Sequence, residues 1–171
     1  MTDAIREWVA SETGNTTIWT NPNAPRPAKP YCTLQVLNVQ RIGRAYTGPV
    51  DAEGKATISM DREVVVSITS YAHTEADPRE ALQTMEALRD SLEKHSVRDY
   101  LASEGWGLRA VELLTDAPQL LDTTWEPRAV FDVRFGTQKQ IIDDLGIIET
   151  AEVQGTVSGY DAGTQTLTVE G

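Results

Sequence analysis

The sequence predicts an α+β protein with a mainly antiparallel mixed sheet, on which one long and one or two short helices pack. Three stretches support this fold class. Residues 129–135 alternate apolar and polar side chains, as a strand does when one of its faces lies on a core. Residues 62–71 form the most β-branched run of the chain and are expected to be a central strand. Residues 77–92 repeat apolar side chains at spacings of three and four, which is typical of an amphipathic helix.

The alternating strand is expected to follow a bulky lead-in of Trp125, Glu126 and Pro127. Pro127 lacks the amide hydrogen that a sheet ladder needs, so it is expected outside the paired region. Trp125 is expected to pack at the entrance of the strand, because an aromatic ring buries a large apolar area. The residues expected on the core face are Ala129, Phe131, Val133 and Phe135.

The N-terminal part predicts a helix and a strand ahead of a proline-rich segment. A short amphipathic helix is expected over residues 4–11, ended by Gly14. Residues 15–19 are β-prone. Residues 21–30 include four prolines within nine residues, and proline fixes φ and disfavours helix in the residue before it. This segment is therefore expected to be extended and stiff, without regular pairing.

A second strand is expected directly after the prolines. Residues 31–39 place Cys32, Leu34 and Val36 on one face of that strand. Residues 41–57 contain three glycines and a proline but few apolar residues. They are expected to form a long hairpin connection.

The strongest helix signal begins at Asp77. Asp77 can cap the helix, Pro78 takes the first helical position, and Glu80 completes a capping box. The apolar stripe of this helix is expected to cover the sheet, and it consists of Ala81, Leu82, Met85, Leu88 and Leu92.

Shorter elements follow this helix. Ser96 is expected to cap a second, shorter helix that Gly105 ends. Residues 108–114 then predict a strand and residues 115–119 a turn. Beyond the alternating strand, residues 141–144 are expected to form a helical turn.

The C-terminal end is polar and rich in threonine. Residues 146–153 predict a strand, and residues 156–158 and 164–169 are expected to pair as a hairpin. The expected organisation is a single domain over residues 1–154, followed by a polar hairpin or tail over residues 155–171.

The composition is that of an ordinary globular protein. The 171 residues are 40% hydrophobic and 24% charged, and a chain of this size can bury about 70% of its unfolded surface. No apolar run approaches the roughly 20 residues of a membrane span, and the first residues lack the apolar region of a secretory signal, so no membrane association is expected. Cys32 is the only cysteine, which excludes an internal disulfide framework and favours synthesis in a reducing cytoplasm.

The charge is strongly acidic but uneven. A formal net charge of −11 argues against a protein that binds duplex DNA by neutralising phosphates. Residues 13–50 nevertheless contain no acidic residue. The four basic residues of this segment are Arg26, Lys29, Arg41 and Arg44. Either this asymmetry provides complementary faces, as in a self-assembling protein, or the basic residues cluster by chance and serve solubility.

Candidate catalytic residues are few, and no enzyme activity, metal or cofactor is expected. His73 and His95 lie at the edges of predicted elements, without a cysteine or carboxylate at metal-ligand spacing. Cys32 alternates with apolar residues, which places it on an apolar face. Asp143 and Asp144 are adjacent, so their side chains diverge on a helix or strand. The sequence also contains no glycine-rich phosphate loop.

Two alternatives stay open beside a role in protein interaction. Residues 27–30 match a PxxP ligand, although a rigid connector that positions Trp19 and Tyr31 is the favoured interpretation. A PxxP-type adaptor would need this loop to be free. A small hydrolase or deaminase-like enzyme would need a cleft with a perturbed acid or base, which two isolated histidines do not provide.

Four pieces of the sequence, in this order and spacing, resemble one known family. They are residues 19–31 (WTNPNAPRPAKPY), residues 62–63 opening the β-branched strand, residues 121–129 (LDTTWEPRA) and residues 146–149 (GIIE). Together they resemble the phage neck or tail terminator (tail-completion) proteins. The resemblance covers about residues 15–153, and the polar tail lies outside it.

The resemblance implies a structural role in a tailed phage, with an α+β fold. Members of the family form a ring, typically six-fold, at the top of the tail. The ring stops tail-tube polymerisation and gives the head connector a surface to join. The implied partners are other copies of the chain, the tail tube protein and head–tail connector proteins, with DNA only as cargo in the lumen. The implied location is the neck or head–tail junction of the virion, after synthesis in the host cytoplasm, and the alternative is another head–tail connector or minor tail protein.

Assembly of this kind suggests which residues meet a neighbour. The basic, proline-stiffened segment would dock on an acidic patch of the adjacent subunit or tube, and an acidic lumen would repel passing DNA. Arg128 can also pair locally with Glu126 or Asp122. The residues expected at assembly interfaces are Trp19, Pro25, Arg26, Pro27, Lys29, Arg41, Arg44, Trp125, Arg128, Asp132 and Arg134.

Overall fold

A computed structural model of the chain describes residues 3–21, 23, 25–73, 77, 79–121, 123–146, 150–153 and 165–168. The described residues form three helices, a mixed sheet of six strands and two further two-stranded sheets, which confirms the α+β class with the sheet dominating. The chain divides into two compact units. The first consists of Met1–Gly43 and Asp61–Gln138, and the second of Arg44–Met60 and Lys139–Gly171.

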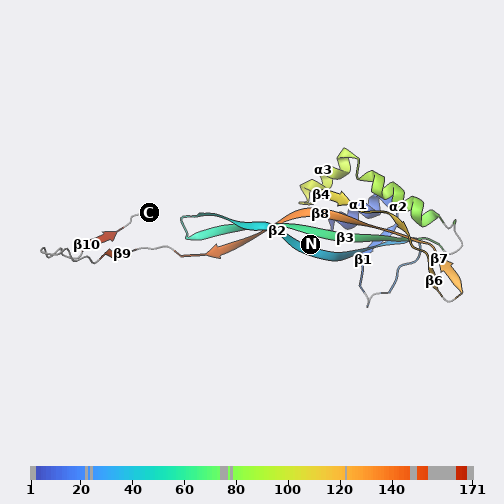
Figure 1. The fold of residues 1–171 in the computed structure, drawn as a ribbon, viewed down its shortest axis with the longest axis horizontal. Coiled ribbons are helices and arrows are strands. Elements are labelled where there is room, and N and C mark those ends of the chain that lie inside the picture. The colour runs from blue at the N-terminus through green and yellow to red at the C-terminus, as the bar shows by residue number, and fades with distance from the viewer. Residues whose placement is uncertain are drawn as a thin grey trace. The chain divides into compact units, whose positions relative to one another are not determined.

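The three helices are similar in length. They are α1 (Ala4–Thr13), α2 (Glu80–Ser91) and α3 (His95–Ser103), with 10, 12 and 9 residues. All three lie on one face of the sheet of the first unit (Figure 1). The predicted combination of one long helix with shorter ones is therefore not confirmed. The helix that was expected to be long, α2, begins at Glu80, three residues after Asp77. Within the described ranges, no helix is long and apolar enough to cross a membrane.

The main sheet has the strand order β1-β2-β3-β8-β4, and β5 also pairs with β8. Its strands are β1 (Thr16–Trp19), β2 (Tyr31–Val50), β3 (Lys55–Tyr71), β4 (Gly107–Val111), β5 (Thr115–Asp116) and β8 (Arg128–Asp144). Strand β1 is parallel to β2, whereas β4 and β5 are antiparallel to β8. Strand β3 takes the middle of the sheet, so the prediction of a central strand over residues 62–71 is confirmed.

Two small hairpins complete the described structure. Strands β6 (Gln119–Leu121) and β7 (Thr124–Glu126) pair with each other, as do β9 (Thr150–Val153) and β10 (Gln165–Thr168). The described partner of β10 is β9, whereas the segment that was expected to pair with residues 164–169 is not among the described residues. Residues 156–158 and 147–149 lie outside the described residues.

The core forms where the helices meet the alternating strand. All four residues predicted for the core face of β8 are buried, as are most residues of the α2 stripe, while Leu82 is partly buried against the core. Phe135 is central to this packing. Its ring meets the rings of Trp8 and Trp106 edge-on, at centroid distances of 6.5 Å and 5.8 Å. This cluster joins α1 and the segment after α3 to the same strand.

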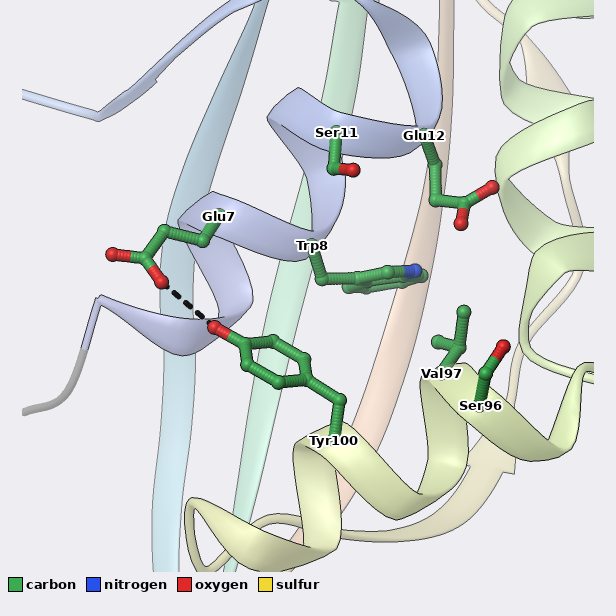
Figure 2. A pocket seen from close by; sticks show the side chains of 7 residues that line it. All are labelled: Glu7, Trp8, Ser11, Glu12, Ser96, Val97 and Tyr100. Carbon is green, nitrogen blue, oxygen red and sulfur yellow. Dashed lines mark hydrogen bonds between the residues drawn. The ribbon is translucent and has the colours of Figure 1, made fainter.

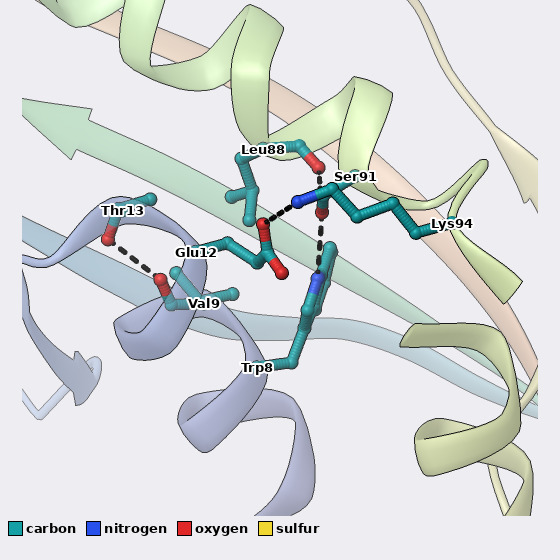
Figure 3. A network of polar contacts seen from close by, with 7 residues as sticks. All are labelled: Trp8, Val9, Glu12, Thr13, Leu88, Ser91 and Lys94. Carbon is teal, nitrogen blue, oxygen red and sulfur yellow. Dashed lines mark hydrogen bonds and ion pairs between the residues drawn. The ribbon is translucent and has the colours of Figure 1, made fainter. Parts of the chain in front are cut away.

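Polar contacts fasten α1 to α2 beside this aromatic cluster (Figure 3). The buried indole N–H of Trp8 donates to Ser91 Oγ at 3.0 Å, and the Ser91 hydroxyl donates to the carbonyl of Leu88 at 2.6 Å. At the helix surface, Lys94 Nζ lies 2.7 Å from Glu12 Oε2. The indole can thus be buried without leaving its donor unsatisfied.

The structure corrects two predictions about the long strands. Residues 41–57 are not a long connection, because β2 continues to Val50 and a turn over residues 51–54 leads directly into β3. Residues 141–144 are not a helical turn, because β8 continues to Asp144. Both segments have mostly exposed side chains and so lack the alternation that marks a strand on a core. Their main-chain pairing needs no such alternation.

Several element ends also differ from the predictions. Helix α2 begins at Glu80, and the Asp77 carboxylate accepts the amide hydrogen of Arg79 at 2.9 Å instead of capping the first turn. Helix α3 begins at His95, which places Ser96 inside the helix. The strand predicted over residues 108–114 ends at Val111, and the predicted turn after it contains the short strand β5. Pro78 lies outside the described residues.

Gly54 closes the turn between β2 and β3 in the second unit. It has a φ of +78°, and a Cβ added there would lie 2.6 Å from the backbone carbonyl carbon of Gly146. The carbonyl of Gly54 also accepts the amide hydrogen of Leu145 at 3.0 Å. Only glycine therefore fits the close approach of these two backbones.

Gly54→Ala is expected to open this contact, with Gly43→Ala as its matched control. Gly43 has a similar φ of +68° but has nothing within 4 Å of an added Cβ, so its replacement carries only the left-handed cost of about 1–2 kcal/mol. Hydrogen–deuterium exchange at the Leu145 amide should accelerate in Gly54→Ala and stay unchanged in Gly43→Ala. Equal exchange in the two variants would show that the backbone contact is not what holds this end of β8.

Candidate functional site

Two of the four stretches that carry the family resemblance, residues 19–31 and 121–129, meet around one buried carboxylate. Glu126, at the end of β7, has a side chain that is only 2% exposed. Lys29 of the proline-rich segment reaches it with Nζ at 2.5 Å from Oε1. Arg128, at the start of β8, donates from Nε to Oε2 at 2.5 Å and also pairs with the carboxylate through a terminal nitrogen. The Glu126 carboxylate thus pairs with two cationic side chains, Lys29 and Arg128, which are far apart in the sequence.

Two tyrosines complete this arrangement. The guanidinium of Arg128 lies over the ring of Tyr71, 4.8 Å from its centroid, and Tyr71 stacks on Tyr31 at 4.5 Å and an interplanar angle of 10°. Burial, and then the neighbouring Tyr71, raise the pKa of Tyr31 above its usual range. We refer to Lys29, Tyr31, Tyr71, Glu126 and Arg128 as the Glu126 cluster.

The Glu126 cluster is built to hold structure rather than to transfer protons. Burial by itself raises the pKa of Glu126, but hydrogen bonds from Lys29 and Arg128 outweigh it, so the pKa lies below its usual range. The carboxylate is therefore ionised, and both its oxygens are occupied by cations. It can fix the proline-rich segment to the start of β8, but it cannot act as a general acid or base without breaking these pairs.

Local geometry explains half of the cluster. Residues two apart in an extended chain face the same side, so Glu126 and Arg128 can pair across Pro127. The predicted local pairing of Arg128 with Glu126 is confirmed, and Pro127 lies between β7 and β8, outside the paired strands as predicted. Lys29 and Tyr71 were not foreseen as partners, because no local spacing brings them to Glu126.

The two tryptophans that were predicted at assembly interfaces, Trp19 and Trp125, differ in their burial. Trp19 is partly buried and packs against the core. Trp125 is 60% exposed, so the prediction that it packs at the strand entrance is wrong. Adjacent residues of a strand point to opposite sides, and at this position Glu126 takes the inward side. Trp125 instead pairs with Leu120 across the β6–β7 hairpin, and Leu120 is also exposed.

The remaining basic residues predicted for interfaces fall into two groups. Arg26, Arg41 and Arg44 are exposed, and none of them forms an ion pair within the described part of the chain. Arg134 is exposed on β8 but is already paired, with Nε at 2.7 Å from Glu112 Oε1 and a terminal nitrogen at 3.7 Å from Glu63 Oε1. The others of the predicted set are exposed Pro25 and half-buried Pro27 and Asp132.

A cavity of about 370 Å³ opens between α1 and α3 (Figure 2). Its lining residues are Glu7, Trp8, Ser11, Glu12, Ser96, Val97 and Tyr100. The Tyr100 hydroxyl donates to Glu7 Oε2 at 2.7 Å, and this hydrogen bond raises the pKa of Tyr100 to about 12. The cavity therefore presents aromatic rings beside carboxylates, and its lining includes no histidine or cysteine.

The residues considered for catalysis do not assemble into a site. His73 and His95 are exposed, and Cys32 is buried on the apolar face predicted for it, where burial raises the pKa of its thiol. Asp143 and Asp144 are exposed at the end of β8. Among the residues whose placement is described, no three histidine, cysteine, aspartate or glutamate side chains could hold a metal ion together.

The sequence was compared with models of known protein families. The family model described as phage neck terminator protein matches residues 1–161. The chain belongs to the phage neck terminator protein family. The match confirms the resemblance and extends it past residue 153, into the polar tail. A search of curated proteins finds no match to the chain.

Membership identifies this neck terminator protein as a structural component of the phage neck. The Glu126 cluster lies inside the matched range and joins residues 19–31 to residues 121–129, two of the stretches that carry the resemblance. The buried ionic contact of Glu126 holds Lys29 of the proline-rich segment against the start of β8.

Proposed function

We propose that this neck terminator protein forms a ring of six copies at the top of the tail tube. There it stops tube polymerisation and joins the tail to the head connector, and DNA passes through its lumen as cargo. The protein acts through assembly, without catalysis, after synthesis in the host cytoplasm. Family membership supports the position in the neck, and one structural observation supports assembly.

That observation is the exposed apolar surface of the second unit. Within residues 44–60 and 139–146 of this unit, only Gly54 and Ala56 are buried. Its strands nevertheless expose large apolar side chains, with Ile142 exposed by 72%. The others are Tyr46, Val50 and Ile141, and Leu145, which directly follows β8, is exposed as well. Large apolar side chains that gather on an exposed surface mark sites of protein interaction, so these strands are suited to being covered by a neighbouring subunit or by the tube.

The charge distribution indicates which residues could meet an acidic surface of a neighbour. Arg26, Arg41 and Arg44 are exposed without an ion pair in the described part of the chain, so they are available to an acidic surface of a neighbour. The rest of the chain carries the excess of acid. An acidic lumen would repel passing DNA and keep it from binding. The other exposed members of the proposed interface are Pro25, Trp125 and Arg134.

The main alternative is another head–tail connector or a minor tail protein, and deletion of the gene from its phage separates the two. Loss of a terminator is expected to give tails of abnormal length that lack heads, measured by negative-stain microscopy of the lysate and restored by the wild-type gene in trans. Tails of normal length that merely lack heads would contradict termination and favour the connector. Joined particles of normal appearance would contradict both roles.

A further inference from the structure

The cavity between α1 and α3 carries a carboxylate whose charge is not neutralised. Glu12 on its far side is paired with Lys94, and Arg6, next to Glu7 in the sequence, pairs with Asp3. The partner of Glu7 is the neutral hydroxyl of Tyr100. Within the described part of the chain, Glu7 therefore has no cationic partner.

The other walls of the cavity suit one chemical group in particular. Figure 2 shows the indole of Trp8, the ring of Tyr100 and the carboxylates of Glu7 and Glu12 around the cavity. Tyr100 is 37% exposed, so part of its ring is open to a partner. A planar guanidinium can donate to a carboxylate while it stacks on aromatic rings, and it sheds water more easily than an ammonium does. The cavity therefore fits an arginine side chain.

The chain itself offers a suitable arginine. Arg26 is exposed, has no ion pair in the described ranges and stands between Pro25 and Pro27. These prolines restrict the backbone on both sides, so less conformational entropy is lost when the side chain binds. The segment around it is free of acid, so its field is complementary to that of the cavity.

Arg26 is not among the residues that line the cavity of its own chain. A contact between Arg26 and this cavity would therefore have to come from a second copy. A contact between two different surfaces of identical chains is heterologous, and such contacts close into rings when the rotation allows. This geometry is the one that a ring of identical subunits requires.

We propose that the cavity between α1 and α3 receives the guanidinium of Arg26 from a second copy of the chain, with Glu7 as its counter-ion and Tyr100 as its stacking surface. This contact rests on the proposed function, because it is a subunit contact of the proposed ring. The proposed contact makes Glu7 the acidic partner of the basic segment, residues 13–50.

Charge reversal tests this contact. The full-length chain is compared with Glu7→Arg, Arg26→Glu and the double variant, by sedimentation velocity over a range of concentrations and by negative-stain microscopy. Each single variant places like charges together and is expected to weaken self-association about tenfold or more. The double variant restores the pair in reverse and is expected to recover association to within about threefold of wild type, since opposite charges then meet again.

Two controls separate the contact from folding and from net charge. Glu86→Arg changes the charge by the same amount on an exposed site of α2 outside the cavity, and it should leave association unchanged. Glu7→Gln keeps a hydrogen-bond acceptor for Tyr100 and removes only the charge, so it should weaken association less than Glu7→Arg. Circular dichroism of each variant reports the fold.

The outcomes distinguish this inference from the function on which it rests. Wild-type rings that persist in both single variants would overturn the Glu7–Arg26 contact and leave the ring intact. Single variants that dissociate without recovery in the double variant would show that the two residues do not meet. A wild-type chain that stays monomeric at every concentration would overturn the contact and also contradict a ring that forms from the chain alone.

Discussion

Glu126→Ala is expected to lower the free energy of unfolding by about 3–5 kcal/mol, which is the usual cost of removing one partner from a buried ion pair. In this protein the effect should reach the upper part of that range, because the carboxylate holds two cations. Without it, Lys29 and Arg128 would lie close together with side chains that are only 24% and 15% exposed. Urea unfolding, followed by tryptophan fluorescence, measures the change.

Glu112→Ala is the matched control for this prediction. Glu112 also pairs with an arginine, Arg134, but both side chains are close to half exposed. Exposed pairs of this kind contribute about 0–1 kcal/mol, so the control should unfold almost as wild type does. An equal, small effect of the two substitutions would contradict the role of the Glu126 cluster as a clamp.

Acidification should report on the same carboxylate. The pKa of Glu126 is lowered in the folded protein, so its contribution to stability is present above the ordinary glutamate pKa of about 4.5 and is lost as the pH falls through the lower folded value. The difference in stability between wild type and Glu126→Gln should therefore shrink below about pH 4.5. A difference that stayed constant from pH 7 to pH 3 would show that the charge of Glu126 does not stabilise the fold.

Phe135→Ala is expected to cost a similar amount, about 3–5 kcal/mol, because it leaves a cavity in a packed core. The lost ring lies between Trp8 and Trp106, so the variant should also alter the near-ultraviolet circular dichroism of the indoles in the folded state. Leu113→Ala removes an apolar side chain that is 88% exposed, and it should change stability by less than about 0.5 kcal/mol. A loss below about 1 kcal/mol in Phe135→Ala would contradict the central place of this ring.

Sequence patterns predicted the elements that touch the core. The alternation around Phe131 and the stripe through Met85 are imposed by burial on one side, and both are confirmed. The distal parts of β2 and β8 could not be recognised in the same way. Their side chains are mostly exposed, so glycine and polar residues suggested a connection and a helical turn where the backbone forms strands.

The candidate site was predictable only where its residues are neighbours in the chain. Glu126 and Arg128 share a face at a spacing of two, and their pairing was foreseen. Lys29 comes from a segment almost a hundred positions earlier, and only the folded sheet brings it to the same carboxylate. Trp125 illustrates the opposite error, because an aromatic residue suggests burial although the alternation of the strand turns it outward.

This phage neck protein is proposed to cap the tail tube as a ring. Cryo-electron microscopy of tail tubes, polymerised from purified tube protein with this protein present, tests it most directly. The predicted result is a ring at one end of each tube, into which the fold of the first unit fits, and an end that no longer grows when fresh tube protein is added. Tubes with bare, growing ends, or density of this protein along the whole tube, would contradict the claim.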